Sequence, residues 1–118
     1  MDPQSIQDLF QGLGPVRTRR MFGGQGIYRH ERIFALEVGG EIYLKADAET
    51  IARFEAAGSR AFSYRDRNGR VTTMSYWLMP SEAADDPAEA ARWGRLALEA
   101  AERAERAKTA KAGRRRSA

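Results

Sequence analysis

The sequence holds no cysteine and one histidine among 118 residues, and these scarcities exclude several classes of site. Without cysteine the chain cannot form a disulfide, a thiolate nucleophile or a cysteine-ligated zinc or iron–sulfur site. One histidine excludes a metal cluster built from several imidazoles. No apolar run reaches the roughly 18 residues of a membrane-spanning helix. The first residues, MDPQSIQDLF, carry acid rather than base, unlike a signal peptide, so we expect a cytoplasmic protein without membrane contact.

Motifs of the common catalytic classes are missing as well. The chain has no Gly-x-Ser-x-Gly elbow, no His-Glu-x-x-His zinc motif and no phosphate-binding loop. His30 falls in a polar turn, where a lone histidine is usually just exposed. The adjacent acids Asp85 and Asp86 precede an expected helix, where carboxylates cap the helix and complement its dipole. We therefore predict a protein that is not an enzyme and has no cofactor and no metal.

The charge of the chain is unevenly distributed. The formal net charge is +4 and the sequence pI is about 9.8, values that suggest nucleic-acid binding. Residues 106–118 contain six basic residues and no acid. The remaining residues 1–105 hold 14 basic and 16 acidic residues, a net charge of −2. The body is therefore mildly acidic, and the excess positive charge belongs to a basic tail.

The hydrophobic periodicity predicts one domain over residues 1–105, in which helices alternate with groups of short strands. Asp2-Pro3 and Asp86-Pro87 are typical helix starts, because aspartate caps a helix and proline fits its first position. The helix that begins at the second pair is expected to end near Ala107. A short middle helix is expected to have Asp47 as its cap.

Alternating apolar residues between these helices predict antiparallel strands. Gly39-Gly40 and Asn68-Gly69 are two-residue hairpin signals, each between runs with a period of two. Adjacent strands joined by hairpins argue against a doubly wound parallel sheet. The pattern α-β(3–4)-α-β(2)-α therefore predicts an α+β fold with two layers, in which three helices pack on one mainly antiparallel sheet.

The same alternation predicts the two faces of the sheet. The residues expected to pack against the helices are Val16, Phe34, Leu36, Ile42, Leu44, Phe62, Tyr64, Met74, Tyr76 and Leu78. The residues expected on the opposite face are Arg17, Arg19, Tyr43, Lys45 and Trp77. Interleaved aromatic and basic groups can stack bases and pair phosphates, but they are equally typical of a face buried in a homodimer. Glu37 and Glu41 on that face would repel phosphate, so we favour a protein partner.

The most unusual stretch of the sequence places Arg17, Arg19 and Arg20 just before Phe22-Gly23-Gly24. Glycines of this kind can let a phosphate approach the backbone. They can equally permit a bulge or a tight bend between paired strands. Because a phosphate-cradling loop normally opens a helix, and a strand is expected here, we favour the structural interpretation.

The basic tail also has two interpretations. It contains no large apolar residue, so we expect residues 106–118 to be disordered. Its cations could bind nucleic acid through counterion release, or the tail could be a solvated terminus without a partner. The tail residues considered for nucleic-acid contact are Lys108, Lys111, Arg114, Arg115 and Arg116.

Several of these motifs, taken together and in order, resemble a known family, the N-terminal domain of the TfoX/Sxy competence regulators. The resemblance covers residues 4–103 and depends on a set of short motifs, none of which is specific alone. These motifs are Arg19-Arg20-Met21-Phe22-Gly23-Gly24, Gly26-Ile27-Tyr28, Phe34-Ala35-Leu36, Tyr43-Leu44-Lys45, Phe62-Ser63-Tyr64 and Met74-Ser75-Tyr76-Trp77, the last of them ahead of Pro80.

The resemblance implies a two-layer α/β fold similar to type III secretion chaperones. It also implies a role in positive regulation of natural-competence genes, together with the cyclic-AMP receptor protein. Larger members carry a second, helix-rich C-terminal domain, which the basic tail replaces here. No catalytic residues are established for the family, so the resemblance implies none for this chain.

Our leading hypothesis is a TfoX-like regulatory module that binds a transcription-related protein. The candidate surface consists of Arg17, Arg19, Arg20 and the Phe22-Gly23-Gly24 turn. A homodimer is a further interpretation. Tyr43 and Lys45 extend that surface along the sheet. The alternative is direct, weakly specific nucleic-acid binding through the basic tail and the strand arginines.

Overall fold

Two Asp-Pro pairs start helices, as the sequence predicts. In the computed structural model, which describes residues 1–21 and 23–117, the Ser5 N–H donates a 2.7 Å hydrogen bond to the carboxylate of Asp2. This bond caps helix α1 (Pro3–Leu9). The N–H groups of Ala88 and Glu89 donate to the carboxylate of Asp86 at 3.0 and 3.3 Å. Helix α3 (Pro87–Ser117) begins there.

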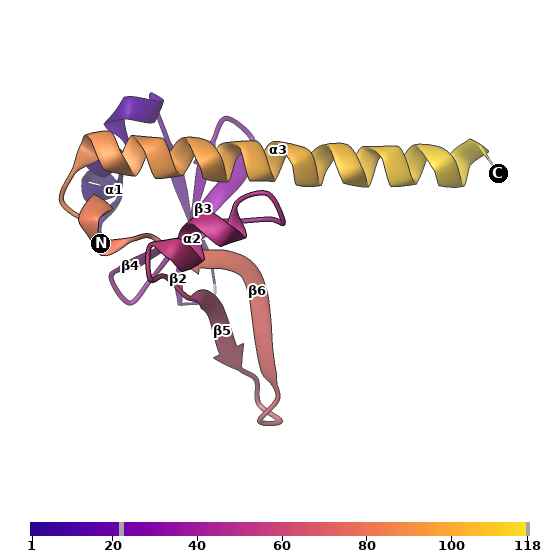
Figure 1. Ribbon diagram of the computed structural model, residues 1–118, viewed down its shortest axis with the longest axis horizontal. Helices are drawn as coiled ribbons and strands as arrows, with labels where there is room; N and C mark the ends of the chain where they lie inside the picture. The colour runs from indigo at the N-terminus through magenta and orange to yellow at the C-terminus, as the bar shows by residue number, and fades with distance from the viewer. Residues whose placement is uncertain (22, 118) are drawn as a thin grey trace.

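The strands form one antiparallel sheet, and both predicted hairpins are present. In the described part of the chain the sheet has six strands in the order β1-β2-β3-β4-β6-β5. The strands are β1 (Arg17–Met21), β2 (Gly24–Arg29), β3 (Arg32–Val38), β4 (Glu41–Lys45), β5 (Ala61–Arg65) and β6 (Val71–Leu78). Gly39-Gly40 joins β3 to β4, and the Asn68-Gly69 turn lies between β5 and β6. The β5–β6 hairpin projects beyond the other strands (Figure 1).

The predicted α+β fold is confirmed, and its main core lies between the helices and one face of the sheet. Helix α2 (Ile51–Ala56) contributes Phe54, whose ring centroid lies 4.9 Å from that of Trp93 on α3. Phe10, just after α1, packs edge-on against Phe34 of β3 at 5.4 Å. Phe10, Phe34 and Phe54 are fully buried. Burial of each such side chain contributes about 1.5–3 kcal/mol to folding.

The predicted assignment of side chains to the two faces is partly wrong. Trp77 lies on the helix side, because it pairs with Leu44 across β4 and β6, and directly paired residues share a face. The residues assigned to the core that instead form or pack against a second cluster on the other face are Leu36, Phe62, Met74, Tyr76 and Leu78. Tyr64 is 48% exposed. Glu37 is buried on the helix side, opposite Ile42.

One irregularity, in β3, explains the errors at Leu36 and Glu37. The register shifts between Ile27 and Tyr28 in the β2–β3 pair, so that Phe34 and Ala35 of β3 both belong to the helix-side core. One extra residue in a strand reverses the faces of all residues beyond it. A strict period of two along the sequence cannot reveal that reversal.

The error on β6 has another cause, because β6 pairs with β4 so that Tyr76 and Leu78 lie on the same face as Tyr43. The shift between Ala61 and Ser63 in the β5–β6 pair adds two residues to β6, so it reverses no face.

The basic tail is helical in the structure, which corrects the expectation of disorder beyond residue 106. Helix α3 does not end near Ala107 but continues to Ser117. Alanine, lysine and arginine are strong helix formers, no proline interrupts them, and the helix is already nucleated by its packed first half. Among the described residues, no helix is long and apolar enough to cross a membrane.

One ion-pair cluster fastens the middle of α3 to the loop before α2. The guanidinium of Arg103 lies 2.6 Å from a carboxylate oxygen of Asp47 and 2.9 Å from one of Glu49. Asp47 therefore has a different role from the helix cap that the sequence suggests, and Thr50 occupies the cap position of α2. The hydrogen bond from Arg103 holds the pKa of Asp47 below its ordinary value of 3.8, and the Glu49 N–H contributes.

We expect Asp47→Asn to lower the free energy of unfolding near neutral pH. A carboxyl group whose pKa is lowered by folding stabilises the protein above its unfolded-state pKa, and this stabilisation is lost as pH falls through the lowered value. The difference between wild type and variant should therefore shrink below about pH 3.8, the ordinary value for Asp47. Urea denaturation followed by circular dichroism at neutral and acidic pH measures it. Glu55→Gln, at an exposed position of α2, is the control and should show no such pattern.

Candidate functional site

The sheet face away from the helices carries an apolar cluster, and we call this side of the sheet the open face. Its buried members are Leu36, Tyr43 and Tyr76, and its partly buried members are Met21, Ile33, Val38, Phe62, Met74 and Leu78. Within the described chain, no residue of a helix belongs to this cluster. A face with this many apolar side chains and no covering layer is typical of a surface that binds another molecule.

The open face continues onto the projecting β5–β6 hairpin. The rings of Tyr43 and Phe62 meet edge-on with their centroids 4.7 Å apart, and Tyr64 follows at 6.3 Å from Phe62. Tyr64 is 48% exposed. Val71 pairs with Arg65, one position from Tyr64, so in the regular register of this hairpin it lies on the opposite side. Val71 is 57% exposed. The hairpin thus offers one large apolar side chain on each of its sides.

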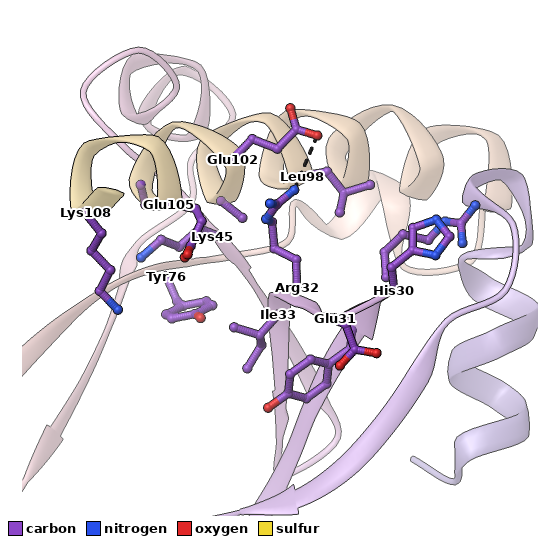
Figure 2. Close-up of a pocket in the computed structure, with 14 residues that line it drawn as sticks. His30, Glu31, Arg32, Ile33, Lys45, Tyr76, Leu98, Glu102, Glu105 and Lys108 are labelled. Carbon is purple, nitrogen blue, oxygen red and sulfur yellow. Dashed lines mark ion pairs between the residues drawn. The ribbon is translucent and has the colours of Figure 1, made fainter. Parts of the chain in front are cut away.

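A groove lies where α3 passes over the end of the sheet beside the open face (Figure 2). Its volume is about 610 Å³. The sheet side includes Tyr28, Ile33, Lys45 and Tyr76, and the α3 side includes Leu98, Ala101, Glu102, Glu105 and Lys108. The turn between β2 and β3, with His30 and Glu31, closes one end. The groove therefore combines an apolar floor, shared with the open face, with charged walls.

Lys45 is the cation most closely held in the groove. Its ammonium group donates a 2.6 Å hydrogen bond to the hydroxyl of Ser75 and lies 5.2 Å from the ring centroid of Tyr76. Burial lowers the pKa of Lys45, and the positive charge of Lys108 adds to the lowering, while Asp47 opposes it. This end of the groove therefore holds two cations, Lys45 and Lys108, together with the carboxylate of Glu105.

The acids of the groove are partly neutralised by arginines. The guanidinium of Arg32 lies 3.6 Å from the carboxylate of Glu102, a pair that crosses the groove from strand to helix (Figure 2). Arg17 lies 3.6 Å from Glu31, donates a hydrogen bond to the carbonyl of His30 at 3.1 Å and lies 5.9 Å from the ring centroid of Tyr28. Both ion pairs are exposed, so each contributes little to stability.

The strand arginines line an edge of the sheet and do not form a cluster. Strand β1 is the edge strand, and Arg17, Arg19 and Arg20 are all exposed. Arg17 and Arg19 pair with Tyr28 and Gly26 and lie on the side of the open face, whereas Arg20 points to the helix side. Charged side chains on an edge strand also prevent the strand from pairing with other chains. The arginines are therefore explained in part by the edge position itself.

The glycines after these arginines are explained by close packing and by a turn. A Cβ atom at Gly24 would collide with the carbonyl oxygen of Glu37 and lie 3.1 Å from the side chain of Val38, so only glycine lets β2 approach β3 here. Gly23 has a positive φ of 75° in the turn between β1 and β2. Phe22, which the sequence analysis included in the candidate surface, lies outside the described residues.

The structure brings together two of the predicted site residues that sequence reasoning kept apart. Lys45 and Lys108 line the same groove, although Lys108 was expected in a disordered tail. Tyr43, a predicted contact residue, is 8% exposed, so it is a buried member of the open-face cluster and has little surface to offer a partner. Lys111 is exposed on α3. Arg114, Arg115 and Arg116 continue the helical backbone, and their side chains lie outside the described part of the chain.

Apart from Lys45 and Lys108, sequence reasoning missed the charged and aromatic residues of the groove. Tyr76 was assigned to the core, and Arg32, Glu102 and Glu105 were given no role in binding. The signal that could have revealed them is the unbroken run of helix-forming residues from Ala100 to Ala112, which predicts that the helix extends past the end of the sheet. Over the described residues, no group of three or more histidine or acidic side chains could hold a metal ion.

The comparison with protein families agrees with the fold and with the resemblance of the motifs. The family described as the TfoX N-terminal domain matches residues 8–101. The chain belongs to the TfoX N-terminal domain family. The protein named DNA transformation protein TfoX1 of Aliivibrio fischeri (strain ATCC 700601 / ES114) is 32% identical over 65 residues, which is 55% of this chain and 31% of that protein. This chain therefore spans about a third of the length of that relative.

The TfoX match includes the whole sheet and the packed half of α3, and it ends at residue 101. The open face is therefore part of the TfoX domain. The basic half of α3, which supplies Lys108 to the groove, lies beyond the matched residues.

We expect Gly24→Ala to lower the free energy of unfolding by about 1–3 kcal/mol, because a backbone oxygen blocks the added methyl group and β2 and β3 must separate. Gly23→Asn is the matched control. The space around Gly23 is open and asparagine tolerates a positive φ, so Gly23→Asn should lower the free energy of unfolding by less than about 1 kcal/mol. Urea denaturation of both variants measures the difference. Equal losses would contradict the close-packing role of Gly24.

Proposed function

We propose that this chain is a non-catalytic, cytoplasmic regulatory module of the competence-related class, which binds a transcription-related protein through its open face and the adjoining groove. The observation that carries the proposal is the apolar cluster on a sheet face that no described helix covers. Membership of the TfoX family and the name of its relative, a DNA transformation protein, support the biological context.

The chemistry of the surface indicates what kind of segment it accepts. Tyrosine, phenylalanine, methionine and arginine are enriched where proteins bind one another, and the open face carries all of these types. Arg17, Arg19 and Lys45 surround the apolar cluster with positive charge, and Glu41 is the acid beside it. The partner segment is therefore apolar with flanking acidic residues. A transcription factor such as the cyclic-AMP receptor protein, implied by the family resemblance, is the first partner to test.

A second copy of this chain is the other occupant to consider. In a symmetric dimer through the open face, the same cationic groups would be present on both copies. Like charges across an interface cost affinity, which makes a self-pair through this face the weaker proposal. The oligomeric state of the purified chain at micromolar concentration tests it directly.

We expect Tyr64→Glu to weaken partner binding by about tenfold or more, because it places a charge on the exposed end of the apolar face. Val71→Glu is the matched control, since it adds the same charge to the opposite side of the same hairpin, at a position that is also well exposed. The measurement is a calorimetric titration of the host's cyclic-AMP receptor protein with the wild-type chain and with each variant.

The two variants should also separate in the native host. Transformation frequency in a strain that lacks the gene should be restored by wild type and by Val71→Glu but not by Tyr64→Glu. Equal behaviour of the two variants in both measurements would refute the open face as the binding surface. Restoration by neither would show that the hairpin itself, rather than one of its sides, is required.

A further inference from the structure

The last third of α3 extends beyond the body of the protein. We call residues 106–117 the basic arm. Helix α3 is 31 residues long and is buried at intervals up to Ala101. From Ala104 to Gly113 every residue is exposed. The helix projects past the sheet along the longest dimension of the molecule, which is 49 Å (Figure 1). At about 1.5 Å per residue the arm is about 18 Å long.

The arm differs in charge from the rest of the same helix. Before it, α3 carries both acids and bases, and Glu105 is the last acid of the chain. The cations of the arm are Arg106, Lys108, Lys111, Arg114, Arg115 and Arg116. Among the described side chains, Arg106, Lys108 and Lys111 make no hydrogen bond or ion pair. Compensation of the helix dipole needs cations only in the last turn, whereas these occupy about three turns.

The helix leaves the body in a fixed direction. At the base of the arm, Arg103 is paired with Asp47 and Glu49 at 2.6 and 2.9 Å, and Glu102 is paired with Arg32 at 3.6 Å. These contacts reach two separate parts of the body, the loop before α2 and strand β3. The arm is therefore a helix whose direction is set by contacts with the body at its base.

We propose that the basic arm binds duplex DNA through its phosphate groups, with the arm lying along the major groove. An α-helix fits the major groove of B-form DNA, and lysine and arginine side chains pair with the phosphates on either side. The deep, narrow major groove of duplex RNA does not admit a helix. Lipid is a poor alternative, because the uncharged residues of the arm are alanine, threonine, glycine and serine and offer no large apolar side chain to insert. This inference does not depend on the proposed function.

The first test is fluorescence anisotropy of a labelled DNA duplex titrated with the full chain at several salt concentrations. Each lost phosphate contact reduces the slope of log affinity against log salt by about 0.9. Lys108→Gln with Lys111→Gln should therefore reduce the slope by about 2 and weaken binding by about tenfold or more at 0.1 M salt. The matched control is Arg92→Gln with Arg95→Gln, which removes the same charge from exposed positions in the packed part of α3 and should change binding little.

A second variant separates a helical arm from a charged but unstructured one. Thr109→Pro keeps every cation, but proline breaks the helix within the arm. We expect it to weaken DNA binding severalfold, with the free energy of unfolding of the body unchanged. DNA binding by Thr109→Pro as tight as that of wild type would contradict the claim that the arm must be helical to bind.

Three other results would overturn the proposal itself. The first is DNA binding as tight as wild type by the variant with Lys108→Gln and Lys111→Gln. The second is an equal loss of DNA affinity in the control with Arg92→Gln and Arg95→Gln. The third is binding of poly-glutamate but not of DNA, which would assign the arm to an acidic protein. A fourfold or greater preference for duplex DNA over duplex RNA of the same length supports the major-groove placement. Loss of partner binding in Tyr64→Glu with DNA binding intact would show that DNA binding by the arm does not require the open face at Tyr64.

Discussion

The arrangement of the whole protein depends on one constraint: the sheet is apolar on both faces, and the helices cover only one of them. Helix α3 can lie close across the sheet because the residues it buries there are small, chiefly Ala90, Ala97 and Ala100. Most of the large side chains in the core between the layers come from the strands, from α1 and the residues after it, and from α2, while α3 adds Trp93 and Leu98. Burying one face in this way contributes most of the folding free energy. The other face is left to pack on itself, with Tyr43 and Tyr76 turned into a shallow cluster. Its exposed side is what the structure offers to a partner.

The line along which α3 leaves the sheet is fixed by a few ion pairs. Arg103 pairs with Asp47 and Glu49, and Arg32 pairs with Glu102. The side chains of Arg103 and Asp47 are half-buried, so their pair contributes more than an exposed pair does, and it acts together with the packing of Ala97 and Ala100 to hold the helix in place. The groove beside the open face exists because the helix continues over the end of the sheet at that point. The direction of the basic arm depends on the same contacts. A surface for recognition and a charged extension therefore have a common structural origin.

The sequence was sufficient to predict the fold class, the helix starts and the hairpins, because each depends on local chemistry. Asp2 and Asp86 cap helices through bonds within a few residues, and the turn at Asn68-Gly69 is held by hydrogen bonds from the N–H groups of Asn68 and Arg70 to the carboxylate of Asp66. The faces of the sheet depend instead on register, and the irregularity near Tyr28 moves Leu36 to the other side without any mark in the alternation. The candidate site was harder still. Lys45 and Lys108 are distant in sequence, and they meet only because α3 does not end where its apolar stripe ends.

The shared position of Lys108 links the two proposed activities physically. Its side chain lines the groove, where it lowers the pKa of Lys45, and it also belongs to the basic arm. An acidic partner segment in the groove would neutralise both lysines and remove one cation from the arm. Duplex DNA on the arm would draw Lys108 toward phosphate and remove a cation from the groove. Two ligands that use one charge oppose each other, and thermodynamic linkage requires that the loss of affinity be the same in both directions. On these two proposals, bound DNA would weaken binding of the partner and the reverse, and the size of that coupling would be bounded by the single charge that the two surfaces share.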